Sequence, residues 1–302
     1  MISQTGEMEV TYPRIAQPNL ALRSLRSLWR FVRTKPLGAI GGFFVLLLVF
    51  SALTAEFISP YDPLTQVPQD RLQGPSWDHW LGTDQLGRDQ LSRIIHGSRT
   101  SLFVGFIAVG LGTLGGTIVG LVSGYLGGLV DLILQRVMDA FQAFPAIVLA
   151  LALISVLGTG IENVMLAIGI VIMPGAGRIV RGAVLAQKAN LYVEAARTIG
   201  CSQTRILVRH ILPNVAAPII VIVSIQLGTA ILAEASLTFL GLGTQPPDPS
   251  WGLMLSSATQ RFMVIQPWMA IAPGIAISLA VFGFNLFGDA IRDVLDPRLR
   301  GT

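Results

Sequence analysis

The stretch from residue 100 to residue 130, TSLFVGFIAVGLGTLGGTIVGLVSGYLGGLV, contains no charged side chain. A helix needs about 20 apolar residues to cross roughly 30 Å of hydrocarbon, so this stretch is long enough to span a lipid bilayer. A glycine stands at every fourth position, namely Gly112, Gly116, Gly120, Gly124 and Gly128. This spacing leaves one helix face without side chains, and we expect that face to pack closely against another helix. The alternative is that the same face also slides or lines a passage.

Further stretches without charged residues lie on both sides of this one, at 36–55, 140–161, 163–177, 210–233 and 262–288. Only 163–177 is short, and Arg178 and Arg181 follow it. Long cationic side chains can lie along a helix and carry their charges to the interface, so we count this stretch as a span too. Of the 302 residues 13% are charged, against about 25% in soluble proteins. The sequence therefore predicts an all-α, polytopic membrane protein with six transmembrane helices.

The distribution of basic residues predicts the orientation, because cytoplasmic segments of membrane proteins carry an excess of lysine and arginine. With the N-terminus in the cytoplasm, the inner segments hold sixteen basic residues and the outer segments hold five. Six crossings then place both termini in the cytoplasm. We expect residues 1–35 to form a basic cytoplasmic segment that is retained as a signal anchor, and residues 36–302 to form one transmembrane domain.

Two outer segments, at about 56–99 and 236–267, are too long to be simple turns. Their tryptophan, proline and aspartate residues suit a lid or a docking surface. A solvated connector is the plainer alternative.

The longest inner polar segment, 187–214, reads QKANLYVEAARTIGCSQTRILVRHILPN. It predicts two short helices, the first capped by Asn190 and the second capped by Ser202 and terminated by Pro213. Between them Gly200 supplies the left-handed residue that ends the first helix. We expect Ala195 and Ala196 to keep one side of this projection narrow. The second helix would present Ile206, Leu207 and Ile211, together with Arg205 and Arg209, and the whole projection would enter a cleft on a partner protein.

In this segment Glu194-Ala195-Ala196, Gly200 and Leu212-Pro213 resemble the cytoplasmic "EAA" loop of permease subunits of binding-protein-dependent ABC importers. One position departs from the family pattern, because His210 stands where an aliphatic residue is usual. Other motifs narrow the resemblance to the C-type subunit of dipeptide and oligopeptide permeases; they are the LGTD…GRD run at 81–89, FLGLG at 239–243, and the run from Gly288 to Arg298. Similar subunits serve glutathione, nickel chelates and opines, so these cargoes stay open.

The resemblance implies a MetI-like permease fold in the bacterial inner membrane and four kinds of partner. These are a homologous second permease, two ATP-binding subunits, an extracytoplasmic substrate-binding protein and the lipid bilayer. ATP and Mg²⁺ would bind to the partner ATPases, since a P-loop needs a Gly-Lys pair and the chain's two lysines, Lys35 and Lys188, follow threonine and glutamine. We therefore expect a transport subunit that is not itself an enzyme, with no cofactor of its own and no nucleic-acid partner. His79, His96 and His210 show no ligand spacing, so no metal site is predicted.

Two further groups of residues are candidates for function. Glu234 lies near the outer end of the fifth span, as a pathway or gate residue or in a structural hydrogen bond. At the end of the sixth span Asp289, Arg292, Asp293 and Arg298 form either a charged latch at the inner face, in contact with the ATPases, or a solvated helix end.

Three other classes of protein fit the sequence less well. An ion-coupled secondary transporter needs charged groups near the bilayer midplane, and no span has an acid or base in its middle. An intramembrane protease needs an embedded nucleophile and base. A channel or scaffold would explain the glycine face but not the inner loop.

Overall fold

The computed structural model describes residue 29 and residues 31–295, without the side chains of residues 258–261. The chain divides into two compact units, Met1–Pro36 and Leu37–Thr302. In the first unit residue 29 and residues 31–34 are helical. The expected cytoplasmic segment 1–35 therefore lies largely outside the described residues, and so does Arg298.

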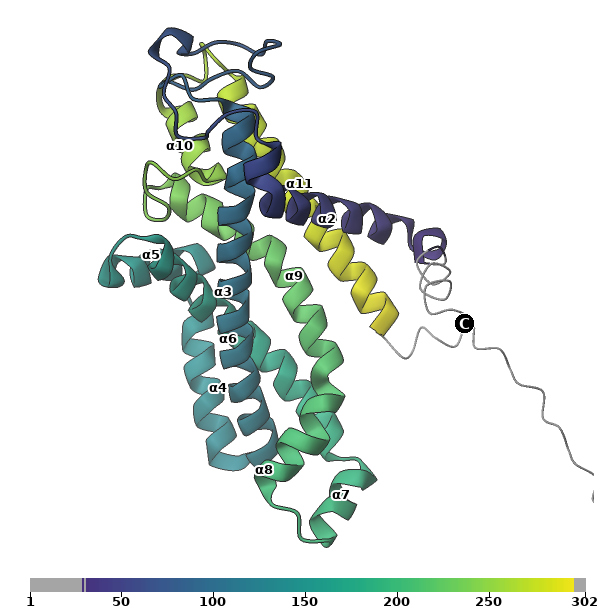
Figure 1. Cartoon of the computed structure of the whole chain (residues 1–302). Helices are drawn as coiled ribbons and strands as arrows, with labels where there is room; N and C mark the ends of the chain where they lie inside the picture. The colour runs from purple at the N-terminus through teal and green to yellow at the C-terminus, as the bar shows by residue number, and fades with distance from the viewer. Residues whose placement is uncertain (1–28, 30, 296–302) are drawn as a thin grey trace, which may run out of the picture. The chain divides into compact units, whose positions relative to one another are not determined.

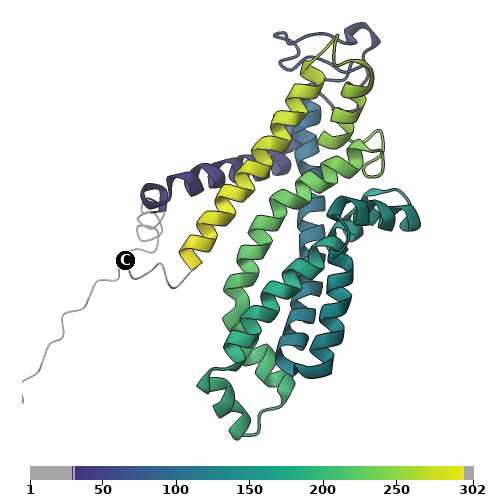
Figure 2. The same cartoon turned by 180° about the vertical axis from the view of Figure 1, so that it is seen from behind.

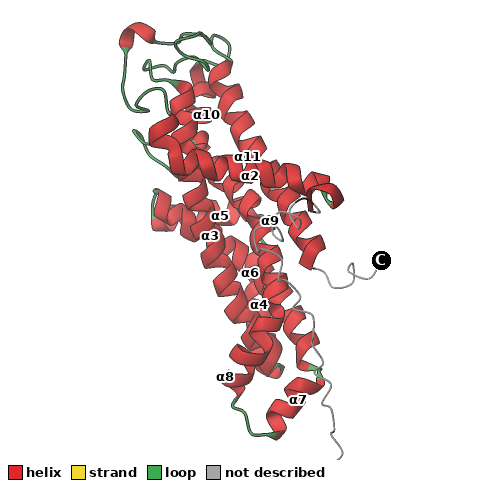
Figure 3. Cartoon of the chain, turned by 45° about the vertical axis from the view of Figure 1, so that its right-hand side comes forward, coloured by secondary structure: helices red, strands yellow, loops and turns green. Residues whose placement is uncertain are grey.

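The second unit is helical throughout its described residues, with short turns and two long loops (Figures 1 and 3). In chain order the elements are α2 (Pro36–Ile58), the 3-10 turn η1 (Pro68–Asp70), α3 (Gln90–Leu126), α4 (Gly128–Gln142), α5 (Ala146–Leu157), α6 (Ile161–Lys188), α7 (Leu191–Thr198), α8 (Gln203–Ile206), the π-helical turn η2 (Leu207–Ile211), α9 (Leu212–Phe239), α10 (Trp251–Arg261) and α11 (Trp268–Leu295).

Among the described residues, five helical segments are long and apolar enough to cross a membrane, and a sixth is obtained if α4 and α5 count as one span. The five are α2, α3, α6, the continuous segment Gln203–Phe239, and α11. The predicted all-helical membrane fold is therefore confirmed.

The predicted third span, 140–161, is wrong as a single straight helix. The chain bends by 93° between α4 and α5. Pro145 has no N–H to continue the hydrogen bonding of α4, and it disfavours a helical conformation at the residue before it. Pro145 takes the N-cap position of α5, with φ −56° and ψ 134°.

Helices α3 and α6 form the most extensive contact of the fold, through the glycine face that the sequence indicates. A Cβ on Gly112 would lie 2.5 Å from the carbonyl oxygen of Gly169, and one on Gly120 would lie 2.6 Å from the carbonyl oxygen of Gly177. Gly116 and Gly124 also lie against the backbone of α6. Glycine is required here because the two backbones leave no room for a side chain.

Gly128, the last glycine of the series, does not belong to this face. It follows the end of α3, has a φ of +56°, and a Cβ at this position would meet no atom within 4 Å. It begins α4 instead.

Helix α9 packs against α3, α6 and α11, with α11 lying alongside α9 (Figure 2). Gly288 of α11 fits against Ser224 and Ile225 of α9, and Gly228 of α9 fits against Val281 of α11. These close contacts fix the position of α11 along α9.

The two ends of α9 carry different structures, as Figure 3 shows. The coupling segment, which we define as residues 187–214, lies at its first end. The outer loops and α10 lie at its other end, where Gln266 Nε2 donates to the carbonyl oxygen of Leu72 at 2.6 Å and Trp251 Nε1 donates to that of Ile94 at 3.0 Å. The described structure thus separates the predicted inner loop from both predicted outer segments.

Candidate coupling surface and transport cavity

The coupling segment forms two helices joined by a tight turn. Gly200 has a φ of +79°, a left-handed conformation that glycine adopts without steric cost. Its N–H donates to the carbonyl oxygen of Arg197 at 2.9 Å, and the N–H of Cys201 donates to that of Ala196 at 3.1 Å. This pair of hydrogen bonds is a Schellman motif, which ends α7 and satisfies carbonyls that the helix leaves free.

The two predicted caps differ in outcome. Ser202 occupies the N-cap of α8, and its hydroxyl accepts from the N–H of Arg205 at 3.4 Å. Asn190 occupies the N-cap of α7 with an extended backbone, but its side chain makes no cap hydrogen bond. Instead Asn190 Nδ2 donates to Gln187 Oε1 at 3.0 Å, so the nearby glutamine replaces the helix N-terminus as its partner.

Pro213 does not terminate the second helix, contrary to the sequence prediction. The chain passes from α8 through η2 into α9 without leaving the helical path. In η2 the N–H of Leu212 donates to the carbonyl oxygen of Leu207, five residues back. This wider turn precedes Pro213 at the first positions of α9, where a missing N–H costs least. The coupling segment is therefore continuous with a membrane-spanning helix.

One side of the coupling segment is buried within the chain itself. Val193, Ala196, Ile206 and Ile211 pack with Tyr125 of α3 and with Val180 and Val184 of α6. The expectation that Ala196, Ile206 and Ile211 face a partner protein is wrong, because these side chains already fill the chain's own core. Burying a side chain such as valine or isoleucine stabilises by about 1.5–3 kcal/mol, so this face fixes the segment firmly to α3 and α6.

The opposite side of the coupling segment is exposed. It presents Glu194, Ala195 and Gly200 together with two large apolar side chains, Leu191 and Ile199, which are 82% and 79% exposed. Apolar side chains of this size on a small projection are typical of a protein interface. The sequence did not identify Leu191 and Ile199, and only their position outside the periodic buried face distinguishes them.

Two cationic side chains also hold the coupling segment to α3. Lys188 Nζ donates to the carbonyl oxygen of Tyr125 at 2.6 Å and lies 5.7 Å from the centre of that ring. The Arg197 guanidinium lies 5.4 Å from the same ring. Cation–π contacts of this kind contribute about 0.5–1 kcal/mol at exposed sites, so Tyr125 links α3, α6 and α7.

Ion pairs connect α4 to α6. Arg181 donates from Nε and Nη2 to the two carboxylate oxygens of Asp131, at 2.6 and 2.5 Å. One turn earlier Arg178 Nη2 donates to Asp139 Oδ1 at 2.8 Å. Arg178 and Arg181, which the sequence predicted to follow a short fourth span, lie within α6 and pair with carboxylates of α4.

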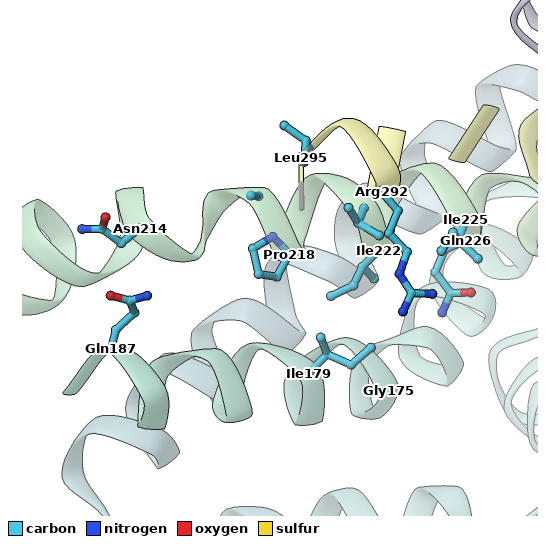
Figure 4. A pocket seen from close by; sticks show the side chains of 12 residues that line it. Gly175, Ile179, Gln187, Asn214, Pro218, Ile222, Ile225, Gln226, Arg292 and Leu295 are labelled. Atoms are coloured by element: carbon cyan, nitrogen blue, oxygen red, sulfur yellow. The ribbon is translucent and has the colours of Figure 1, made fainter. Parts of the chain in front are cut away.

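A cavity of about 810 Å³ lies between α6, α9 and α11 (Figure 4). Its wall is mostly apolar, with Ile179 from α6 and Pro218, Val221, Ile222 and Ile225 from α9. The polar part of the lining is three amide side chains, Gln187, Asn214 and Gln226, and one charged side chain, Arg292. The cavity extends from the coupling segment to the middle of α9, a volume and composition suited to a small organic ligand.

The structure describes three of the four predicted latch residues and places them in different surroundings. Arg292 is exposed and lines the cavity beside Gln226, near Ile222. Ile222 lies eight residues beyond the end of the coupling segment, which is about 12 Å along the axis of α9. Asp289 is exposed, and Asp293 is half-buried and has a partner of its own. Arg298 is not described. The geometry thus brings Arg292 to the cavity and not to the coupling segment.

Glu234 is buried between α3 and α9. Its carboxylate accepts from Ser101 Oγ at 3.3 Å and from Thr238 Oγ1 at 3.0 Å. It is not among the residues that line the large cavity. This position favours the structural hydrogen bond over a contact with cargo.

The LGTD…GRD motif builds the start of α3. Asp84 accepts from Arg88 Nε at 2.7 Å and from two backbone N–H groups. Asp89 is the N-cap of α3, accepting from the N–H of Ser92 at 2.8 Å, and it also contacts His79 Nδ1 at 2.9 Å. No group of three or more metal-binding side chains occurs among the residues described. The role of this motif is therefore structural, because it anchors the first outer segment to a spanning helix.

FLGLG has an equivalent role at the other end of α9. The N–H of Gly241, whose φ is +83°, donates to the carbonyl oxygen of Thr238 at 2.9 Å, and that of Leu242 donates to Leu237 at 3.0 Å. This is a second Schellman motif, which ends α9 and turns the chain into the second outer segment.

Comparisons with known proteins agree with this geometry. The family described as "Binding-protein-dependent transport system inner membrane component" matches residues 116–301, and the "N-terminal TM domain of oligopeptide transport permease C" matches residues 24–75. The glutathione transport system permease protein GsiD of Pectobacterium atrosepticum is 46% identical over 276 residues, which cover 91% of each chain. GsiD of Escherichia coli O6:K15:H31 is 43% identical over 288 residues, or 95% of each chain.

Among solved structures, a chain of the MetNI methionine ABC transporter in an inward facing conformation superposes with a TM-score of 0.55. It is 16% identical and covers 68% of this chain and 97% of the solved chain, a likeness in fold.

The chain therefore belongs to the permease family of binding-protein-dependent ABC importers, in the branch of dipeptide and oligopeptide C-type permeases. It is a multi-pass protein of the inner membrane and the translocation component of an importer.

Proposed function

We propose that this chain forms a heterodimer with a homologous permease, and that the pair imports small peptides, with glutathione among them. Two ATP-binding subunits would grip the exposed side of the coupling segment, and an extracytoplasmic binding protein would deliver cargo to the outer loops. The close relatives named as glutathione permeases support this cargo class. Nickel chelates and opines are the other cargoes to test.

One structural observation carries the proposal: the coupling segment is continuous with the wall of the cavity. Its buried side is fixed to α3 and α6 through Tyr125, Val193 and Ile206. Its second helix runs through η2 into α9, which supplies more than half of the cavity lining. A displacement of the coupling segment would therefore move the cavity wall as a unit.

This connection supports alternating access by rigid-body movement. Closure of the ATPases on ATP would push Glu194, Ala195 and the apolar side chains beside them. Helix α4 would follow α6, because the Asp131–Arg181 and Asp139–Arg178 pairs join the two. The cavity would then open to one side of the membrane at a time.

The chain's own contribution is mechanical and steric, and the ATP and Mg²⁺ sites would belong to the partner ATPases. Both termini would lie in the cytoplasm, as the excess of basic residues in the inner segments indicates. On the outer side Trp77 and Trp80 are 95% and 66% exposed and would form part of the surface that receives the binding protein.

Two substitutions at Gly200 test the coupling role. Gly200→Arg places a long charged side chain on the exposed turn, and we expect ATPase subunits to be lost on purification and uptake to stop. Gly200→Asn is the matched control, because asparagine tolerates the left-handed conformation and adds little bulk. A Gly200→Arg complex that keeps both its ATPases and its uptake would exclude the coupling role.

The cargo is tested with the complete assembly, including the binding protein, reconstituted in lipid. We expect glutathione or a dipeptide to stimulate ATP hydrolysis. Stimulation by nickel chelates or opines alone would contradict the peptide assignment and leave the coupling role intact.

A further inference from the structure

Arg292 is the one charged residue among the side chains that line the large cavity of the described structure. It belongs to the last turn of α11, and in Figure 4 its guanidinium points into the cavity beside the side-chain amide of Gln226. Ile222 lies next to it, and Ile179 lies on the opposite wall. An exposed cation therefore stands at the edge of a cavity whose other lining residues are apolar or carry neutral amides.

The guanidinium of Arg292 makes no hydrogen bond or ion pair with another described residue. Arg178 and Arg181, on the helix across the cavity, are both paired with carboxylates of α4. The Arg292 side chain is itself exposed, so its N–H donors are open to a ligand that enters from the solvent. An exposed guanidinium that pairs with no described residue can take an anionic partner by charge-assisted hydrogen bonds.

The chemistry of the guanidinium defines the partner. Its planar fork matches a carboxylate with two parallel N–H···O bonds, and Gln226 can donate a further hydrogen bond from its amide. The apolar side chains of Ile222 and Ile225 suit the aliphatic part of the same molecule. Small peptides, glutathione included, have a carboxylate at one end and short side chains along the rest.

We propose that Arg292, with Gln226, binds the carboxylate of the cargo as it passes through the cavity between α6, α9 and α11. The inference rests on the proposed function, since it requires the cargo to use this cavity. It assigns Arg292 to selection by charge at the permease itself, separate from selection by the binding protein. A carboxylate of the second permease subunit is the other occupant that the experiment must distinguish.

Direct binding to the nucleotide-free complex of both permeases and both ATPases, held in lipid nanodiscs, tests the inference. Omitting the binding protein from this assay removes its own selectivity. The probes are dialanine and its C-terminal amide, which differ at the carboxylate. We expect the wild-type complex to prefer dialanine, and Arg292→Gln to weaken dialanine binding about tenfold or more while leaving the amide unchanged.

Arg292→Lys should restore part of the preference, because lysine keeps the charge and loses the fork. Arg136→Gln is the matched control: it removes an exposed arginine on α4, away from the cavity, and should bind dialanine as the wild type does. Equal binding of acid and amide by the wild type, including no measurable binding of either, would overturn the inference. An equal loss of binding of both probes in the Arg292→Gln complex would also overturn it. Loss of the second permease subunit from that complex would overturn it too, because the subunit would then be the partner of Arg292.

Uptake by the wild-type assembly separates this result from the proposed function. Wild-type uptake of dialanine together with an unaffected Arg292→Gln complex overturns only the role of Arg292. A wild-type assembly that neither retains ATPases nor transports any peptide overturns the proposed function.

Discussion

Replacing Gly116 by alanine tests the close contact between α3 and α6. The added Cβ would lie 2.6 Å from the carbonyl oxygen of Met173, 2.7 Å from the N–H nitrogen of Gly177 and 2.8 Å from the Cβ of Ala176. Two of these atoms belong to the backbone of α6 and cannot rotate away. The helices must separate by roughly 1 Å before such contacts reach the usual 3.5 Å, and dispersion contacts along the whole face weaken with that gap.

We expect Gly116→Ala to destabilise the protein by about 1–3 kcal/mol, the usual range for an overpacked core. The assay is the melting temperature of the purified complex in detergent, followed by the loss of the intact peak in size-exclusion chromatography. Gly110→Ala is the matched control on the same helix, since a Cβ there meets no atom within 4 Å and alanine favours a helix over glycine. Melting of Gly116→Ala at or above the temperature of Gly110→Ala would refute the close-contact interpretation.

Three further substitutions have distinct expected outcomes. Glu234→Gln keeps an acceptor for Ser101 and Thr238 and should preserve uptake, whereas Glu234→Leu leaves those hydroxyls unpaired and should lower stability by about 1–3 kcal/mol. Loss of uptake in a stably folded Glu234→Gln complex would instead indicate a pathway role. Asp89→Ala removes the cap of α3 and should cost about 0.5–2 kcal/mol in thermal unfolding, so an unchanged melting temperature would count against the cap. Leu191→Asp changes an exposed side chain and should leave the fold intact but reduce co-purification of the ATPases, and full retention of the ATPases would argue against this interface.

Features set by local chemistry could be predicted from the sequence. Length without charge predicted the spanning helices, and the need for a left-handed residue predicted the turn at Gly200. The bend between α4 and α5 was missed because the number of consecutive uncharged residues does not show whether the helix axis changes direction. Pro145 gave a signal for that bend, since it removes a hydrogen bond in the interior of an apolar run.

Features that depend on packing between distant segments could not be predicted. Ile206 and Leu191 are both apolar residues of the coupling segment, yet Ile206 is buried against α3 and α6 and Leu191 is exposed. The position of Arg292 depends on how far α11 slides along α9, which the contact of Gly288 with Ile225 decides. Neither fact follows from hydrophobic periodicity within a single helix.

The side of the membrane on which the coupling segment emerges can be measured by thiol labelling in intact cells. Cys201 is half-buried, so the measurement uses Ile199→Cys and, on the outer segment, Trp77→Cys, each in a Cys201→Ser background. We expect a membrane-impermeant maleimide to label the Trp77→Cys variant in intact cells, and the Ile199→Cys variant only after the cells are permeabilised. Labelling of the Ile199→Cys variant from outside would place the coupling segment on the wrong side for ATPases and would contradict the proposed importer mechanism.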